Sequence, residues 1–247
     1  MEPKEKRSLW EQSSSSELDS SRRWSRIRNR RRRAVEEIAP VHKTLFGEMW
    51  TVENNYKFMD TAYSTEFLGA HTDCTYLTEA CRIQNFHCLK MAEEGGETLL
   101  VDGFHIAEEL RKSEPKSYDY LSSHAIPSEY MEEGKHYKSL DLVFKHHPVS
   151  KRLKQFRFNL YDRAPLSSLP FDQIDAYYRH LQPLVSRVRK PSNEFWIKLE
   201  PGQVLFIDNW RVMHGRNQFR GPRLFSGCYL GNAEFLSKAR VLGFGVD

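Results

Sequence analysis

Two histidines and one aspartate have residue types and spacing that suit a metal centre. His71 and Asp73 are two residues apart in Gly-Ala-His-Thr-Asp-Cys, and on an extended strand this spacing projects both side chains to one face. His214 follows a stretch that looks like a buried strand and can close the set. Two histidines and a carboxylate leave part of an octahedral coordination sphere open, as in non-haem Fe(II) oxygenases. A bidentate 2-oxo acid and O2 would occupy the open positions.

Two alternatives to this triad stay open on the sequence. His-x-Asp is short enough to arise by chance as an exposed ion pair. The pair His146-His147 offers a competing ligand, although neighbours on a strand face opposite ways.

A bound 2-oxo acid with a second carboxylate needs a basic partner, and a planar guanidinium pairs with a carboxylate bidentately. Arg223 begins a strand-like run nine residues after His214, where it can reach back alongside the metal. Thr98, in Gly-Gly-Glu-Thr, can add a hydroxyl donor. Without such a ligand, Arg223 is a surface strand end and Thr98 an ordinary strand residue.

The elements that would position these residues are mainly strands. Runs rich in aromatic and branched residues indicate strands at residues 83–91, 97–101, 153–160, 195–199, 204–207 and 224–230. Helical periodicity occurs at residues 104–111 and 171–188, and the apolar pattern from Ala34 suits a short helix leading into Gly47 and Trp50. Pro201-Gly202 predicts a tight connection between two consecutive strands. This pattern predicts a mainly β fold with inserted helices, a sandwich or barrel, and not a doubly wound α/β sheet.

The net charge of +4 is unevenly distributed along the 247 residues. Residues 1–33 hold 11 basic and five acidic side chains, which leaves the other 214 residues at −2. We therefore expect a basic, disordered leader over residues 1–36, with a helix nucleating near Arg26, and one globular domain over residues 37–247. The near-neutral domain gives no electrostatic reason to expect a nucleic-acid partner, so any such binding would rest on the leader.

The composition supports neither membrane association nor disulfide bonds. We expect no membrane association, because no apolar run approaches the length of a membrane span. The four cysteines lack paired Cys-x-x-Cys spacing and are expected to be reduced thiols in strands or core.

Three segments together resemble a known family. They are His71-Thr-Asp73, residues 95–103 (Gly-Gly-Glu-Thr-Leu-Leu-Val-Asp-Gly) and residues 193–216, which end in Asn-Trp-Arg-Val-Met-His-Gly-Arg. They resemble the trimethyllysine dioxygenase and γ-butyrobetaine hydroxylase family of Fe(II)/2-oxoglutarate oxygenases, from about Ala34 to the C-terminus. The resemblance implies a double-stranded β-helix (jelly roll) and C3 hydroxylation of N6,N6,N6-trimethyl-lysine, the first step of carnitine synthesis. 2-Oxoglutarate and O2 would be cosubstrates, and ascorbate would keep the iron reduced.

The resemblance also assigns roles to individual residues. It places Fe(II) on His71, Asp73 and His214 and pairs 2-oxoglutarate with Arg223. An aromatic cage would hold the substrate's quaternary ammonium by cation–π attraction, and two polar residues would face its amino-acid end. The cage positions are Phe46, Trp50, Tyr63 and Tyr229, and the polar positions are Asp60 and Asn159. Phe46 stands where the family usually carries Tyr, and Leu160 stands where it usually carries Asn.

Several further expectations follow. Family members carry an N-terminal zinc domain and strands before the segment matching Ala34, so we expect an N-terminally truncated member. The alternatives are a γ-butyrobetaine hydroxylase, or a catalytically impaired paralogue that acts by binding a partner through its strand edges. The partner expected first is the small-molecule substrate, and a homodimer is compatible with the sequence. The family implies a mitochondrial protein, with a cytoplasmic location as the alternative because the leader also carries acidic residues.

Overall fold

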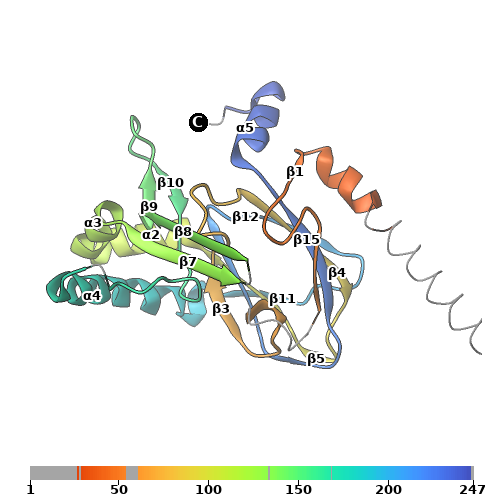
Figure 1. The fold of residues 1–247 in the computed structure, drawn as a ribbon, viewed down its shortest axis with the longest axis horizontal. Coiled ribbons are helices and arrows are strands. Elements are labelled where there is room, and N and C mark those ends of the chain that lie inside the picture. The colour runs from red at the N-terminus through yellow and green to blue at the C-terminus, as the bar shows by residue number, and fades with distance from the viewer. Residues whose placement is uncertain (1–26, 28, 54–60, 133, 168, 246–247) are drawn as a thin grey trace, which may run out of the picture.

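The structure is a computed structural model that describes residues 27, 29–53, 61–132, 134–167 and 169–245 (Figure 1). Asp60 and Arg26 lie outside the described residues, as does most of the expected leader. The predictions made for them therefore stay predictions.

Two antiparallel sheets enclose a common interior (Figure 1). In the larger sheet, β15 lies between β4 and the short strands β1 and β2, and β12 forms the far edge. Its strands are β1 (Val41–His42), β2 (Trp50–Glu53), β4 (Ile83–Lys90), β12 (Val204–Asp208) and β15 (Leu224–Leu230). The four-stranded sheet has the order β11 (Phe195–Ile197), β6 (Thr98–Asp102), β13 (Val212–Arg216) and β3 (Leu68–His71). The fold is thus a jelly-roll type with inserted helices, which confirms the predicted fold class.

The register of the four-stranded sheet decides which residues face the interior. His214 on β13 lies opposite His71 on β3 and Leu100 on β6. Because side chains alternate along a strand, Leu99, Val101 and Met213 point the other way, into a helical layer.

That helical layer packs on the outer face of the four-stranded sheet (Figure 1). It consists of α2 (Gly103–Ser113), α3 (Pro115–Ser123) and α4 (Phe171–Val188), with the strand pair β9 (Phe144–His146) and β10 (Leu153–Phe156) beside them. Asp102 caps α2 by accepting hydrogen bonds from the backbone N–H groups of Phe104 and His105. The largest apolar core of the described residues fills this layer and includes Ile106, Leu110, Leu184 and Phe156.

Smaller elements complete the chain. β7 (Ile126–Glu132) and β8 (Lys135–Asp141) form a hairpin, and β5 (Glu94–Gly95) pairs with β14 (Phe219–Arg220). Two short 3-10 helices, η1 (Thr61–Tyr63) and η2 (Pro191–Asn193), precede β3 and β11, and α5 (Asn232–Val241) follows β15.

Two predicted elements differ from the structure in their bounds. The helix expected from Ala34 instead covers residues 27 and 29–36, and Val35 on it is only 1% exposed because it packs against the outer face of the larger sheet. Packed structure therefore reaches into the segment expected to be a leader. The strand expected over residues 153–160 ends at Phe156, since the backbone N–H of Phe158 donates to the Thr72 hydroxyl instead of to a neighbouring strand.

The two strands joined around Pro201-Gly202 are both present, but they belong to different sheets. β11 pairs with β6 and β12 pairs with β4. The connection therefore crosses from one sheet to the other. The sequence could not indicate this, because the pairing partners are about 100 residues away along the chain.

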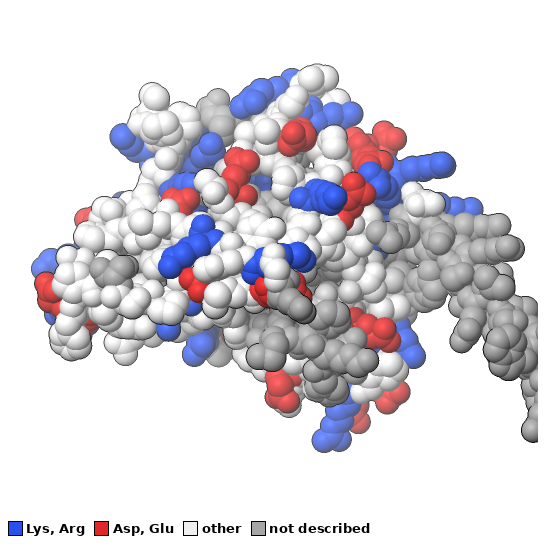
Figure 2. Space-filling model, in the orientation of Figure 1, with Lys and Arg blue, Asp and Glu red and all other residues white. Residues whose placement is uncertain are grey.

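The four cysteines are as the composition predicts, buried and without disulfide partners. None of the described helices is long and apolar enough to cross a membrane. Basic and acidic side chains of the described residues are interspersed over the face shown in Figure 2.

Candidate active site

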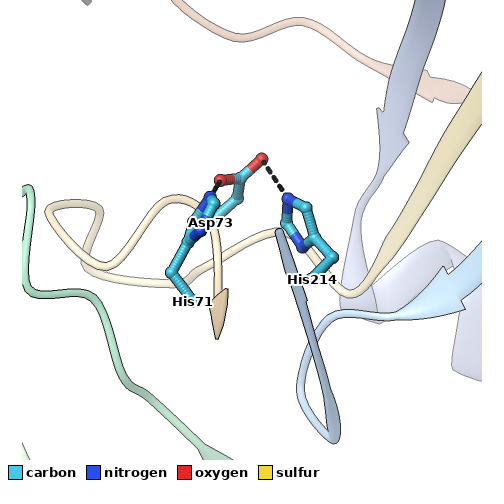
Figure 3. Close-up of side chains that lie close together, drawn as sticks. All are labelled: His71, Asp73 and His214. Atoms are coloured by element: carbon cyan, nitrogen blue, oxygen red, sulfur yellow. Dashed lines mark ion pairs between the residues drawn. The ribbon is translucent and has the colours of Figure 1, made fainter. Parts of the chain in front are cut away.

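His71, Asp73 and His214 converge in the interior between the sheets, as Figure 3 shows. One ligand atom from each residue lies within 4.8 Å of the others. His71 Nε2 is 3.3 Å from Asp73 Oδ1, and His214 Nε2 is 3.7 Å from Asp73 Oδ2. His71 ends β3 and Asp73 follows in the loop, so the two side chains lie together although Asp73 is not on the strand where the sequence placed it. His214 lies within β13, not after it.

The competing ligand pair is not part of this cluster. His146 instead shares a 2.7 Å hydrogen bond with the Tyr118 hydroxyl in the helical layer. Within the described part of the chain, the group of residues able to hold a metal ion is His71, Asp73 and His214.

Hydrogen bonds fix the orientation of the His71 ring and of the Asp73 carboxylate. The Nδ1–H of His71 donates to the Gly69 carbonyl at 2.8 Å, which leaves Nε2 as the ligating atom. Gln84 Nε2 and the Tyr229 hydroxyl both donate to Asp73 Oδ2, at 2.6 and 2.7 Å. Asn209 binds the backbone N–H and carbonyl of Asp73. These groups belong to four separate stretches of chain, so the site depends on both sheets.

The protonation states of His214 and Asp73 suit metal ligation. Burial lowers the pKa of His214 to about 3, so its imidazole is neutral at physiological pH. Burial also lowers the pKa of His71, but hydrogen bonding and charge from Asp73 outweigh it and leave that pKa raised. Burial raises the pKa of Asp73, yet its interactions with His214, His71 and Tyr229 bring it below its usual range, so the carboxyl is ionised. An ionised carboxylate beside imidazoles is the donor set that an Fe(II) site requires.

One pocket is lined by nearly all the candidate site residues that the sequence indicated. Its walls include the three candidate ligands and, beyond them, Arg223, Thr98, Phe46, Trp50, Tyr63, Tyr229 and Asn159. Asp60 is the one candidate outside the described residues.

Arg223 is a buried cation whose charge lacks a partner among the described residues. It is 8% exposed, its Nε has no hydrogen-bond partner there, and its guanidinium lies over the Phe225 ring at 3.8 Å from the centroid. Burial, with the nearby charge of Arg216, lowers the pKa of Arg223 to about 9. A buried cation of this kind favours an anionic ligand in the pocket.

Aromatic rings form another part of the pocket wall. Trp50 lies 5.8 Å from Tyr229 and 5.6 Å from Phe86, measured between ring centroids. Trp50 can lie this close to β15 because residue 227 is glycine, where an added Cβ would meet the indole at 2.2 Å. Phe46 packs edge-on against Tyr130 of the β7–β8 hairpin at 5.8 Å. An aromatic wall of this kind suits a cation without N–H donors, because aromatic faces attract a positive charge without hydrogen bonds.

Several residues of the site were not found from the sequence. Asn209 and Arg216 act through hydrogen bonds to chain segments that are distant in sequence, and Gln84 acts through one to Asp73, 11 residues away. Arg216 donates to the carbonyls of Ala62, Ser64 and Glu66 and so holds the segment that carries Tyr63. Asn209 and Arg216 both lie inside the motif of residues 193–216, which was the available signal. Gln84 had no signal beyond being a polar residue in a predicted strand.

Comparison with known proteins identifies the family. Residues 28–229 match the family described as "Taurine catabolism dioxygenase TauD, TfdA family". The match covers most of the chain, and the chain belongs to this family of dioxygenases.

Individual relatives are more specific. "Trimethyllysine dioxygenase, mitochondrial" from Bos taurus is 43% identical over 213 residues, which cover 85% of this chain and 51% of the relative. "Gamma-butyrobetaine dioxygenase" from Homo sapiens is 27% identical over 210 residues, covering 82% of this chain and 54% of the relative. The chain thus spans about half the length of the curated relatives it matches. A putative alpha-ketoglutarate-dependent taurine dioxygenase from Burkholderia xenovorans shares the fold, with a TM-score of 0.58 and 15% identity over 78% of this chain and 70% of that one.

Proposed function

We propose that this protein is an Fe(II)- and 2-oxoglutarate-dependent dioxygenase that hydroxylates N6,N6,N6-trimethyl-lysine at C3. The observation that carries the proposal is the convergence of His71, Asp73 and His214 in a pocket that also holds the buried Arg223. The 43% identity to a trimethyllysine dioxygenase supports the choice of substrate over γ-butyrobetaine, whose dioxygenase is 27% identical.

The three ligands would hold the iron. When bound, Fe(II) supplies the redox chemistry that couples oxidative decarboxylation of 2-oxoglutarate, giving succinate and CO2, to hydroxylation of the substrate. The protein's part is to orient the ligands, and it does so through Gly69, Gln84, Tyr229 and Asn209.

The remaining pocket residues would bind the two organic molecules. Arg223 would pair with the distal carboxylate of 2-oxoglutarate, and the Thr98 hydroxyl on β6 would add a donor. The aromatic rings of Phe46, Trp50 and Tyr229 would hold the trimethylammonium group. Fixing that end decides which carbon faces the iron, so binding geometry sets the site of hydroxylation.

The test is succinate formation by purified protein with Fe(II), ascorbate and trimethyl-lysine, with γ-butyrobetaine in parallel. We expect turnover of trimethyl-lysine that disappears in His214→Ala. Turnover of γ-butyrobetaine alone would contradict the substrate, and no 2-oxoglutarate decarboxylation under any condition would contradict the enzyme.

Arg223 gives a more selective version of this test. Arg223→Met should weaken 2-oxoglutarate binding by roughly 10- to 100-fold, the loss expected for a hydrogen-bonded charge pair. Arg223→Lys keeps the positive charge but loses the planar guanidinium, so its affinity for 2-oxoglutarate should lie between those of the wild type and Arg223→Met. Equal 2-oxoglutarate affinities in all three proteins would exclude Arg223 from that role.

We also propose a mitochondrial location, on the support of the relatives named mitochondrial trimethyllysine dioxygenase. A C-terminally tagged chain expressed in animal cells should colocalise with a mitochondrial marker. A diffuse cytoplasmic signal would contradict this.

A further inference from the structure

We propose that Cys74 and Cys81 form a thiol pair that hydrogen peroxide oxidises to a disulfide, and that this disulfide weakens metal binding at the neighbouring Asp73. Formation of the disulfide depends only on the fold. Its effect on the metal rests on the proposed function, whose mechanism uses neither thiol.

The two cysteines lie at the ends of the loop that follows the candidate ligand Asp73. Cys74 is the next residue after Asp73, and Cys81 lies two residues before the start of β4. Asn209 holds the two ends together, because its Nδ2 donates to the Asp73 carbonyl at 3.1 Å and to the Cys81 carbonyl at 2.9 Å. One amide nitrogen reaches two carbonyl oxygens only where they lie side by side. The loop therefore returns to the place where it began.

The two thiols lie in contact where the loop closes. They belong to one buried cluster with Trp50 and Tyr229, and Cys74 and Cys81 are 1% and 2% exposed. The Cys74 thiol is hydrogen-bonded to the Cys81 thiol, and the backbone N–H of Cys81 also donates to the Cys74 sulfur. Sulfurs in such contact can join with a small movement of the loop.

The backbone at Cys74 makes Asp73 sensitive to that movement. Cys74 has a φ of 63°, a left-handed conformation that is uncommon outside glycine, and the N–H of Leu77 donates to its carbonyl at 3.0 Å. A disulfide brings the sulfurs from non-bonded contact to about 2.05 Å. Because a peptide bond joins Cys74 to Asp73, the shift moves the Asp73 carboxylate away from Gln84 and Tyr229, which donate to it.

The oxidation consumes one molecule of hydrogen peroxide. The sulfur of one cysteine attacks a peroxide oxygen, the O–O bond breaks, and the released hydroxide takes up the thiol proton to form water. The second sulfur attacks the resulting sulfenic acid, the S–O bond breaks, and a second water leaves with the other thiol proton. The two thiols lose two electrons, which reduce the peroxide.

The rate of this oxidation is limited by the protonated state of the thiols. The hydrogen bond to Cys81, together with burial, raises the pKa of the Cys74 thiol well above its usual value. Because the thiolate is the reactive form, oxidation is slow at neutral pH. The pair therefore stays reduced until peroxide accumulates.

Tryptic digestion makes the disulfide directly measurable. Cys74 and Cys81 lie in one tryptic peptide, residues 58–82, and Cys88 lies in the next, residues 83–90. The whole protein is treated with hydrogen peroxide, denatured, alkylated and digested, and the peptides are analysed by mass spectrometry. We expect the first peptide without alkylation and lighter by two hydrogens, and alkylated twice when dithiothreitol precedes alkylation. The Cys88 peptide should be alkylated in both samples.

The effect on the metal is measured by Mn(II) titration after the peroxide is removed. Oxidation should lower the Mn(II) affinity of the wild type by roughly 10-fold, the loss expected when a ligand is displaced from its orienting partners, and reductant should restore it. Cys74→Ala should keep its affinity under the same treatment. Cys88→Ala is the matched control, because Cys88 is also buried but belongs to another cluster, and it should respond as the wild type does.

The outcomes separate this inference from the proposed function. If the peptide of residues 58–82 stays fully alkylated while peroxide oxidises methionines of the same protein, the thiol pair is overturned. If the disulfide forms and Mn(II) affinity is unchanged, or if Cys74→Ala loses affinity as the wild type does, the effect on the metal is overturned. A wild type that binds no Mn(II) in either state contradicts the proposed function and with it that effect, while the mass spectrum still decides the disulfide. The wild-type spectrum also decides where a variant fails to fold.

Discussion

The two faces of the four-stranded sheet carry opposite kinds of residue on the same strands. The outward face packs apolar side chains into the helical layer, and the inward face presents polar ones to the pocket. The outward residues are Leu99, Val101 and Met213, each at most 1% exposed, and the inward residues are Thr98, His214 and Arg216, 5 to 7% exposed. Met213 and His214 are thus neighbours in sequence with different tasks.

Along these strands, a residue that stabilises the fold is followed directly by one that lines the pocket. The outward face contributes apolar burial to folding. The inward face buries polar groups, including Arg223 across the pocket, whose desolvation is unfavourable until ligands arrive. Substitutions on the two faces should therefore change different measurements.

The largest effect is expected on the inward face. His214→Ala removes one of three candidate ligands and should lower activity by more than about a thousandfold, since groups that only orient a ligand already account for 10- to 100-fold. Added Mn(II) should raise the melting temperature of the wild type but not of the variant. The melting temperature without metal should stay the same or rise, and a large fall would contradict the separation of the two faces.

On the outward face, Met213→Ala should act on stability instead. Met213 is fully buried in the core below the helical layer, and truncation to Ala should lower the free energy of unfolding by about 3 kcal/mol. Denaturant unfolding measures this loss. At low temperature, the activity per folded molecule should remain within about twofold of the wild-type value. If Met213→Ala lowered the metal affinity as much as His214→Ala does, the two faces of the sheet would not have separate roles.

A smaller effect is expected from the opposing sheet. Gln84→Leu removes a donor to Asp73 Oδ2 but leaves that of Tyr229, so Mn(II) affinity should fall by roughly 10-fold, at the low end of such effects. Asn85→Leu is the matched control, because Asn85 is fully buried and its side-chain amide has no partner among the described residues. It should leave Mn(II) affinity unchanged and stability equal or higher. Equal losses of affinity in both variants would argue against orientation of Asp73 by Gln84.

The smallest effect is expected at Thr98. Thr98→Val keeps the shape and removes one neutral hydroxyl, so the KM for 2-oxoglutarate should rise by roughly 3- to 10-fold with kcat little changed. Steady-state kinetics with varied 2-oxoglutarate measures this. An unchanged KM would remove Thr98 from the binding site and leave it as a strand residue of the inward face.

The sequence by itself determined the residue types and the local patterns. The spacing of His71 and Asp73, the motif ending at His214 and the charge of Arg223 were sufficient to nominate an iron and 2-oxoglutarate site. The strand patterns were sufficient for a mainly β fold. These features are visible because alternation and short motifs are local properties of the chain.

Only the tertiary structure decided which polar groups meet. Tyr229 reaches Asp73 from a strand 156 residues further along the chain, and Gln84 reaches it from the opposing sheet. β11 and β12 lie in different sheets. Asn159 was nominated as a residue facing the substrate, and the structure places it in the pocket wall with its side-chain amide hydrogen-bonded to Thr72, Tyr161 and Asp162. Hydrogen bonds depend on distances through space that sheet pairing sets, and a linear pattern carries no record of them.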